Sequence, residues 1–160
     1  HMAAHKGHFK VFEYIAERVS DLNVETSDRS TPLHLAASEG HFEIVRYIVG
    51  IVSDKNPVTD DGNTPLHEAA RKGHLEIYKY IADQVDNKNS ANYVGTTPLH
   101  EAARKGHLEI CKVIILDHGT DPNAKDQDNH SALDLASTKQ IRDLIRKNSI
   151  KIKLSKKRKL

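Results

Sequence analysis

Histidine is the residue type in this chain with the widest choice of chemistry. The sequence holds 11 histidines, and an imidazole ring can bind zinc or transfer protons near neutral pH. Seven of them recur in fixed contexts, three after Thr-Pro-Leu and four after glycine: His34, His67 and His100, and His8, His41, His74 and His107. A residue that recurs with its neighbours indicates architecture, so we interpret these seven as hydrogen-bonding residues at helix ends and in loops.

The sequence carries none of the usual signatures of catalysis or metal binding. It has one cysteine and no His-Glu-x-x-His motif, so no zinc pair is present. It also lacks a phosphate-binding glycine loop and a Gly-x-Ser-x-Gly elbow. Cys111 lies in an apolar run, where a small buried side chain fits well. We therefore predict a protein that is not an enzyme and uses no metal and no other cofactor.

The elements that position these residues recur with a period of 33. Thr-Pro-Leu-His begins at Thr31, Thr64 and Thr97, and an Ala-Ala pair and a Gly-His pair recur in the same phase. The 14 residues that start at Thr64 are identical to the 14 that start at Thr97. Self-similarity at such a fixed period indicates a stack of repeated structural units.

The residue pattern of each unit predicts two antiparallel helices and a projecting turn. The hydroxyl of Thr31 can cap a helix, and Pro32 suits the first helical turn. Gly40 can take the left-handed conformation that ends a helix, after which apolar residues from Phe42 to Val49 recur at helical spacing. Polar, turn-prone residues follow at 53–63, so we expect a finger between units.

These motifs, together with Gly-His-Leu-Glu-Ile and the seven residues from His118 to Ala124, resemble the ankyrin repeat. The resemblance implies an all-α repeat solenoid, an array of antiparallel helix pairs with projecting β-hairpin or loop fingers. We assign residues 1–148 to this array and residues 149–160 to a basic C-terminal tail. Within the array we expect a partial repeat at 1–30, full repeats at 31–63, 64–96 and 97–130, and a C-terminal capping repeat at 131–148.

Three stretches depart from the regular pattern. The segment from Glu109 to Gly119 is one residue longer than its equivalent in the preceding repeat, which predicts a shifted or extended second helix. In the tail, Ile150, Ile152 and Leu154 alternate with lysines, which favours an extended segment. The first residues match only the later part of a first helix, so we expect a longer parent protein.

In the ankyrin family, partners usually meet the finger tips and the exposed side of the first helices. Carried over by position, this implies a partner-binding set on the fingers and on two first helices: Asp28, Asp60, Asp61, Asn63, Tyr93, Val94, Gln127 and Asp128, then Arg71, Lys72, Arg104 and Lys105. Tyr93 is the candidate anchor, because tyrosine is enriched among interface hot spots. Alternatively, these charges only solvate the surface, with Glu68 and Glu101 neutralising the basic residues three and four positions later.

The resemblance implies a non-catalytic protein–protein interaction module. We expect a monomer that binds a partner protein through its concave face and finger tips. The basic stripe on the first helices favours a partner with an acidic surface. No small-molecule cofactor is expected.

The tail supports an alternative function. From Lys147 onward the chain carries 7 of the 24 basic residues and no acidic residue, which leaves 17 basic against 22 acidic residues before that point. Four consecutive basic residues resemble a nuclear-import signal: Lys156, Lys157, Arg158 and Lys159. The alternative is therefore a nuclear, nucleic-acid-associated regulatory factor that contacts nucleic acid only through the tail. The sequence has neither a secretory signal nor an apolar run of the roughly 20 residues that a membrane span needs, so we expect an intracellular protein, cytoplasmic or nuclear.

Overall fold

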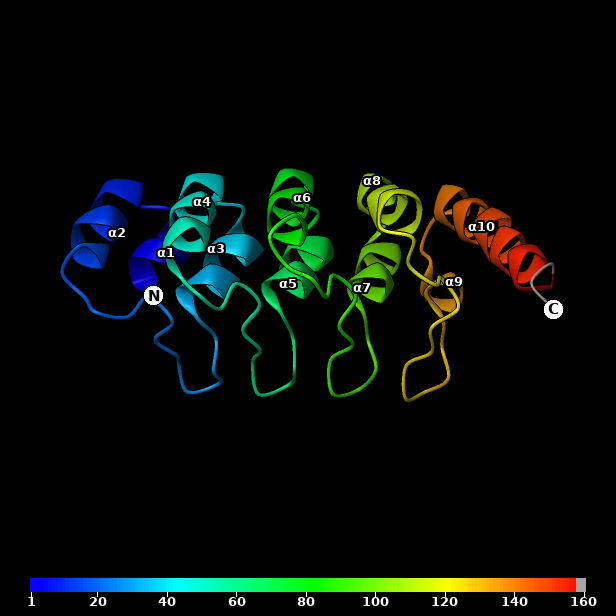
Figure 1. Cartoon of the computed structure of the whole chain (residues 1–160), viewed down its shortest axis with the longest axis horizontal. Coiled ribbons are helices and arrows are strands. Elements are labelled where there is room, and N and C mark those ends of the chain that lie inside the picture. The colour runs from blue at the N-terminus through cyan, green and yellow to red at the C-terminus, as the bar shows by residue number, and fades with distance from the viewer. Residues whose placement is uncertain (158–160) are drawn as a thin grey trace.

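The computed structural model describes the backbone of residues 1–157 and the side chains of residues 1–150, and it shows a row of helix pairs (Figure 1). In the described part of the chain, the one β-type pairing is an isolated bridge between Lys125 and Ser131. The predicted all-α repeat solenoid is therefore confirmed. The elements in chain order are α1 (Met2–Lys6), α2 (Phe9–Ala16), α3 (Pro32–Glu39), α4 (Phe42–Ile51), α5 (Pro65–Lys72), α6 (Leu75–Ala82), α7 (Pro98–Lys105), α8 (Leu108–Lys112), the π-helix η1 (Val113–Asp117), α9 (Ala132–Leu135) and α10 (Lys139–Lys157).

The Thr-Pro-Leu-His motif starts the first helix of each full unit. In α5, Nδ1 of His67 accepts the backbone N–H of Thr64 at 3.1 Å and lies 2.9 Å from the Thr64 hydroxyl. Pro65 occupies the first helical position, where no intrahelical N–H bond is lost. The histidine therefore completes a reciprocal cap at the helix start, and the same contacts recur in α3 and α7.

The helices form two layers along the row. The first helices α1, α3, α5, α7 and α9 pack on one another in sequence, and the second helices α2, α4, α6 and α8 form the other layer (Figure 1). Alanines that are fully buried separate the first helices, which lets their backbones approach closely: Ala36, Ala69 and Ala102. Isoleucines from the second helices fill the space between the layers: Ile48, Ile81 and Ile114. The core is therefore continuous along the stack, and each unit shelters its neighbours.

The histidines that follow glycine join each unit to the one before it. Nε2 of His41 donates to the carbonyl of His5 at 3.0 Å. The equivalent bonds run from His74 to Ser38 at 3.0 Å and from His107 to Arg71 at 3.1 Å. The structural interpretation of the recurring histidines is thus confirmed for six of the seven, and His8 is the exception.

The extra residue in the third full repeat is absorbed in a π-helical turn. Helix α8 continues into η1, and the backbone N–H of His118 donates to the carbonyl of Val113, five residues earlier, at 3.1 Å. The predicted extension of this second helix is confirmed. A π-turn holds one residue more than an α-turn, so the apolar residues on both sides of it keep their places in the core.

Four loops project from the first-helix layer to one side of the stack (Figure 1). We call these segments, residues 26–30, 59–63, 92–96 and 126–130, the finger loops. Each is closed by one backbone bond between its first and last residue, as from the N–H of Thr59 to the carbonyl of Asn63 at 3.0 Å. Near each tip one residue has a positive φ: Arg29, Gly62, Gly95 or Asn129. In the described range the fingers are therefore turns rather than paired strands.

The C-terminal helix is longer than the sequence suggests. Helix α10 runs without a break from Lys139 to Lys157, so the extended segment predicted for residues 150–154 is wrong. Its apolar or buried positions Ile141, Ile145 and Asn148 follow helical spacing, and Ile152 continues that spacing. The periodicity of the packed part therefore extends the helix beyond Asn148, the last buried side chain that the structure describes.

Candidate functional site

Two hollows lie next to each other between the finger loops and the first helices. One has a volume of about 200 Å³ and extends from Asn63 to Asp128, and the other has about 270 Å³ and extends from Asp28 to Arg71. They share Asn63, Glu68 and Arg71, so they form one continuous depression. We call the residues that line either hollow the inner groove.

The finger loops are tied to one another along their tips. The N–H of Asp60 donates to the carbonyl of Asp28 at 3.0 Å, and the N–H of Tyr93 donates to the carbonyl of Asp61 at 3.0 Å. The last finger donates twice, from the N–H of Gln127 to the carbonyl of Val94 at 2.9 Å and from the Gln127 side chain to the carbonyl of Tyr93 at 2.7 Å. The four tips therefore form a connected row.

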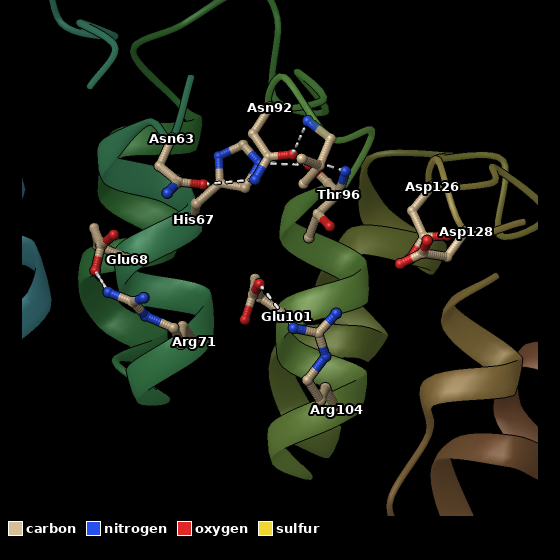
Figure 2. A pocket seen from close by; sticks show the side chains of 11 residues that line it. Asn63, His67, Glu68, Arg71, Asn92, Thr96, Glu101, Arg104, Asp126 and Asp128 are labelled. Atoms are coloured by element: carbon tan, nitrogen blue, oxygen red, sulfur yellow. Dashed lines mark hydrogen bonds and ion pairs between the residues drawn. The ribbon is translucent and has the colours of Figure 1, made fainter. Parts of the chain in front are cut away.

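Polar side chains fix the base of the fingers beside the groove. Nε2 of His67 donates to the carbonyl of Thr96 at 2.9 Å, and the Asn92 amide donates to Oδ1 of Asn63 at 2.8 Å (Figure 2). Burial lowers the pKa of His67 from 6.5 to about 4. The ring is therefore neutral at physiological pH, with its proton on Nε2, and acts as a structural connector.

Two ion pairs occupy the wall formed by α5 and α7. Arg71 pairs with Glu68, and Arg104 pairs with Glu101 at 3.5 Å (Figure 2). Glu68 is only 9% exposed, and burial raises its pKa although Arg71 opposes the shift. The neutralisation of both arginines at a spacing of three is confirmed. Lys72 and Lys105 are exposed at the ends of the two helices and line neither hollow.

The remaining charge of the inner groove is negative. The larger hollow contains four carboxylates, from Asp28, Asp60, Asp61 and Glu68, against the single guanidinium of Arg71. The other contains Glu68, Glu101, Asp126 and Asp128 against Arg71 and Arg104. Hydrogen bonds from Thr26 and Ser30 hold the pKa of Asp28 below its usual range. The groove therefore carries the opposite sign to the basic stripe that the helix sequences suggest.

A family model for ankyrin repeats in three copies matches residues 1–92, 51–126 and 84–152. The chain belongs to the ankyrin-repeat family. Proteins of this family are in general non-enzymatic modules that bind other proteins. No curated protein matches the chain.

The ankyrin array brings most of the predicted partner-binding residues together. Those on the finger row or in the inner groove are Asp28, Asp60, Asp61, Asn63, Arg71, Tyr93, Val94, Arg104, Gln127 and Asp128. Asn92 and Asp126 also line the inner groove but were not predicted from the sequence. Each is the first residue of a finger loop and directly precedes a predicted residue, Tyr93 or Gln127, and this position could have identified both.

Other chemistry finds no support in the described part of the array. In residues 1–150, no group of three or more histidine, cysteine or acidic side chains could hold a metal ion. Burial raises the pKa of the Cys111 thiol to about 12, so it is not a reactive thiolate. Within the same described part, no helix is long and apolar enough to cross a bilayer.

The basic cluster of the tail falls mostly outside this description. Lys156 and Lys157 end α10, but their side chains lie outside the described residues. Arg158 and Lys159 lie outside them altogether. The import signal and the contact with nucleic acid therefore stay predictions.

Proposed function

We propose that this ankyrin array binds a partner protein inside the cell along the finger row and the inner groove. The observation that carries the proposal is an exposed apolar pair on the third finger. Tyr93 is 62% exposed and Val94 is 53% exposed. An aromatic and a branched side chain presented together at a loop tip favour a contact that removes them from water.

The finger row suits binding because its backbone is already fixed. The bonds from Tyr93 to Asp61 and from Gln127 to Val94 hold the third finger on both sides. A surface that is ordered before association loses less conformational entropy when a partner docks. Tyr93 is therefore the proposed anchor, with Val94 beside it.

Charge defines the second property of the partner. The inner groove has more carboxylates than guanidiniums, so we expect basic side chains of the partner to enter it. Lys72 and Lys105 lie outside the groove, where they can meet an acidic surface at the rim. The proposed partner therefore has basic side chains opposite the inner groove and an acidic surface opposite Lys72 and Lys105.

The test is affinity capture from a cell lysate, followed by titration of the same captured protein against variants of this chain. We expect Tyr93→Ser combined with Val94→Ser to weaken affinity by about tenfold or more. Asp60→Lys combined with Asp61→Lys should weaken it as well, mainly through a slower association rate. Matched substitutions on the second-helix layer, Glu76→Lys and Lys79→Glu on α6, should leave affinity within about twofold.

Two outcomes would overturn the proposal. One is unchanged affinity in both finger variants while the α6 variants lose binding. The other is binding that disappears when residues 155–160 are removed and that weakens steeply with salt, which would favour nucleic acid bound through the tail.

A further inference from the structure

The first helix pair exposes apolar residues that every later pair buries. Val11 on α2 is 53% exposed, whereas its equivalents in the next three units are 1%, 2% and 1% exposed: Ile44, Ile77 and Ile110. Ile15 is 48% exposed, whereas its equivalents Ile48, Ile81 and Ile114 are fully buried. In those units the preceding helix pair packs against the same side.

Tyr14 indicates that an aromatic side chain of a preceding unit is expected at this surface. Its equivalent Tyr47 packs edge-to-face with the Phe9 ring of the preceding unit, with ring centres 6.0 Å apart. The next equivalent, Tyr80, packs edge-to-face with Phe42, with ring centres 5.5 Å apart. Tyr14 itself is 60% exposed, and the Arg18 guanidinium lies over its ring at 3.6 Å.

His8 adds a polar requirement that is independent of the apolar surface. Its equivalents His41, His74 and His107 each donate from Nε2 to a backbone carbonyl 36 residues earlier, in the preceding unit. His8 is exposed and makes no side-chain hydrogen bond within the described part of the chain. The ring therefore stands where a preceding unit would present a carbonyl.

We infer that His8, Val11, Tyr14 and Ile15 form one half of a repeat–repeat interface, which we call the N-terminal face, and that it docks a further ankyrin-type helix pair. This pair stacks on α1 and α2 as α1 and α2 stack on α3 and α4. It presents an aromatic ring to Tyr14, a backbone carbonyl to His8, and apolar side chains to Val11 and Ile15. The inference concerns a different surface from the proposed function and does not depend on it.

Continuity with the existing interfaces favours this occupant over a second copy of the chain. A second copy stacked in line would have to offer its C-terminal cap. Residues 131–150 of the cap expose one large apolar side chain, Ile150, in the described part of the chain. A preceding ankyrin-type unit can supply all three features at once, because the units that begin at His1 and at Thr31 supply them to their successors.

The test extends the full chain at its N-terminus with a copy of residues 31–66, which keeps the 33-residue phase. The copied Phe42 then stands opposite Tyr14, and the copied Ser38 carbonyl opposite His8. Both chains carry Ile15→Cys. We expect a thiol reagent to label the chain without the extension, called the parent chain, readily. The extended chain should be protected to the level of Ile48→Cys. The buried Cys111 thiol, with its pKa raised to about 12, gives little background.

A second extension makes the result independent of one design. A copy of residues 64–99 has Leu75 at the position of Phe42, so it offers the carbonyl and the apolar surface without the aromatic ring. Both extensions should protect position 15. The extension with the aromatic ring should raise the melting temperature by about 5 °C relative to the parent chain. The extension without the ring should raise it by less. His8→Ala should lower the melting temperature of the extended chains and leave that of the parent unchanged.

Labelling that persists at position 15 in both extended chains would overturn the inference. So would a parent chain that sediments as a dimer and becomes monomeric on Ile15→Asp, because a second copy would then be the occupant. An equal effect of His8→Ala with and without the extension would remove the proposed role of His8.

Discussion

The buried histidine network and the finger row recur with the same period, yet they differ in what is held constant. His34, His67 and His100 share the preceding Thr-Pro-Leu and form the same hydrogen bonds with the threonine of that motif. At the finger tips the equivalent residues change from unit to unit, as from Asp61 to Val94. Constancy within the array therefore accompanies buried polar contacts, whereas variation accompanies an exposed surface that can be specialised for a partner.

The largest expected difference between the two regions is in stability. His67 is 1% exposed and joins Thr64 to Thr96, so His67→Ala leaves buried donors and acceptors without partners. We expect a loss of about 3 kcal/mol in the free energy of unfolding, measured by urea denaturation. Tyr93→Ala should change it by less than about 0.5 kcal/mol. Similar losses in the two variants would break the distinction.

The second difference is in the response to acid. Burial lowers the pKa of His67 from 6.5 to about 4, so the unfolded chain takes up the proton first as the pH falls. The stabilisation from the neutral ring is complete above about pH 6.5 and is lost as the pH falls toward 4. Between pH 7 and pH 5, His67 alone should account for a loss of about 2 kcal/mol.

Denaturation of the parent chain and of His67→Ala at both pH values isolates this contribution. The variant should lose less stability on acidification than the parent does. Glu68 acts in the opposite direction, because burial raises its pKa, but it is present in both proteins and cancels in the comparison. Parallel losses in the two proteins would contradict the assignment to His67.

A third prediction separates two neighbouring basic residues on α5. Arg71→Glu leaves the buried Glu68 carboxylate without its cation and adds a like charge, which should cost about 2 kcal/mol. Lys72→Glu changes an exposed residue and should cost less than about 0.5 kcal/mol. Equal melting temperatures for the two variants would show that the Glu68–Arg71 pair does not stabilise the array. A loss of partner affinity in Arg71→Glu therefore tests the groove only if the variant is shown to remain folded under the conditions of the binding measurement.

The smallest expected effect distinguishes two glycines. Gly73 has φ +84° and a Cβ there would lie 2.6 Å from the His107 ring, so Gly73→Ala should cost about 1 kcal/mol or more. Gly50 lies within α4, and a Cβ there would meet no neighbouring group within 4 Å, so Gly50→Ala should stabilise by about 0.5 kcal/mol. Thermal unfolding of both variants checks the contrast, and the same sign for both would contradict it.

Much of the fold follows from short-range sequence features. The identical residues from Thr64 and from Thr97 give helices with the same caps, Pro65–Lys72 and Pro98–Lys105. The extra residue before Gly119 correctly indicates a change in the second helix, since the core positions on either side must stay in register. These features depend on contacts within one unit or between identical units.

The features that the sequence could not supply depend on longer-range packing. The sign of the groove is set when Asp126 and Asp128 approach α7 from the next finger while Glu68 and Glu101 neutralise the arginines. A local alternation at residues 150–154 suggested an extended segment, whereas the packed face of α10 continues its helical spacing through it. The N-terminal face is identified only by comparing the exposed fractions of equivalent side chains in successive units, and these fractions depend on the packing between units.

Hydrogen–deuterium exchange of the array with its captured partner tests the central claim most directly. We predict that the partner slows exchange in the finger loops at residues 59–63 and 92–96 and in the first helices α5 and α7, and leaves α6 and α8 unchanged. Protection confined to α6 and α8, with the finger loops exchanging as in the free array, would contradict the account.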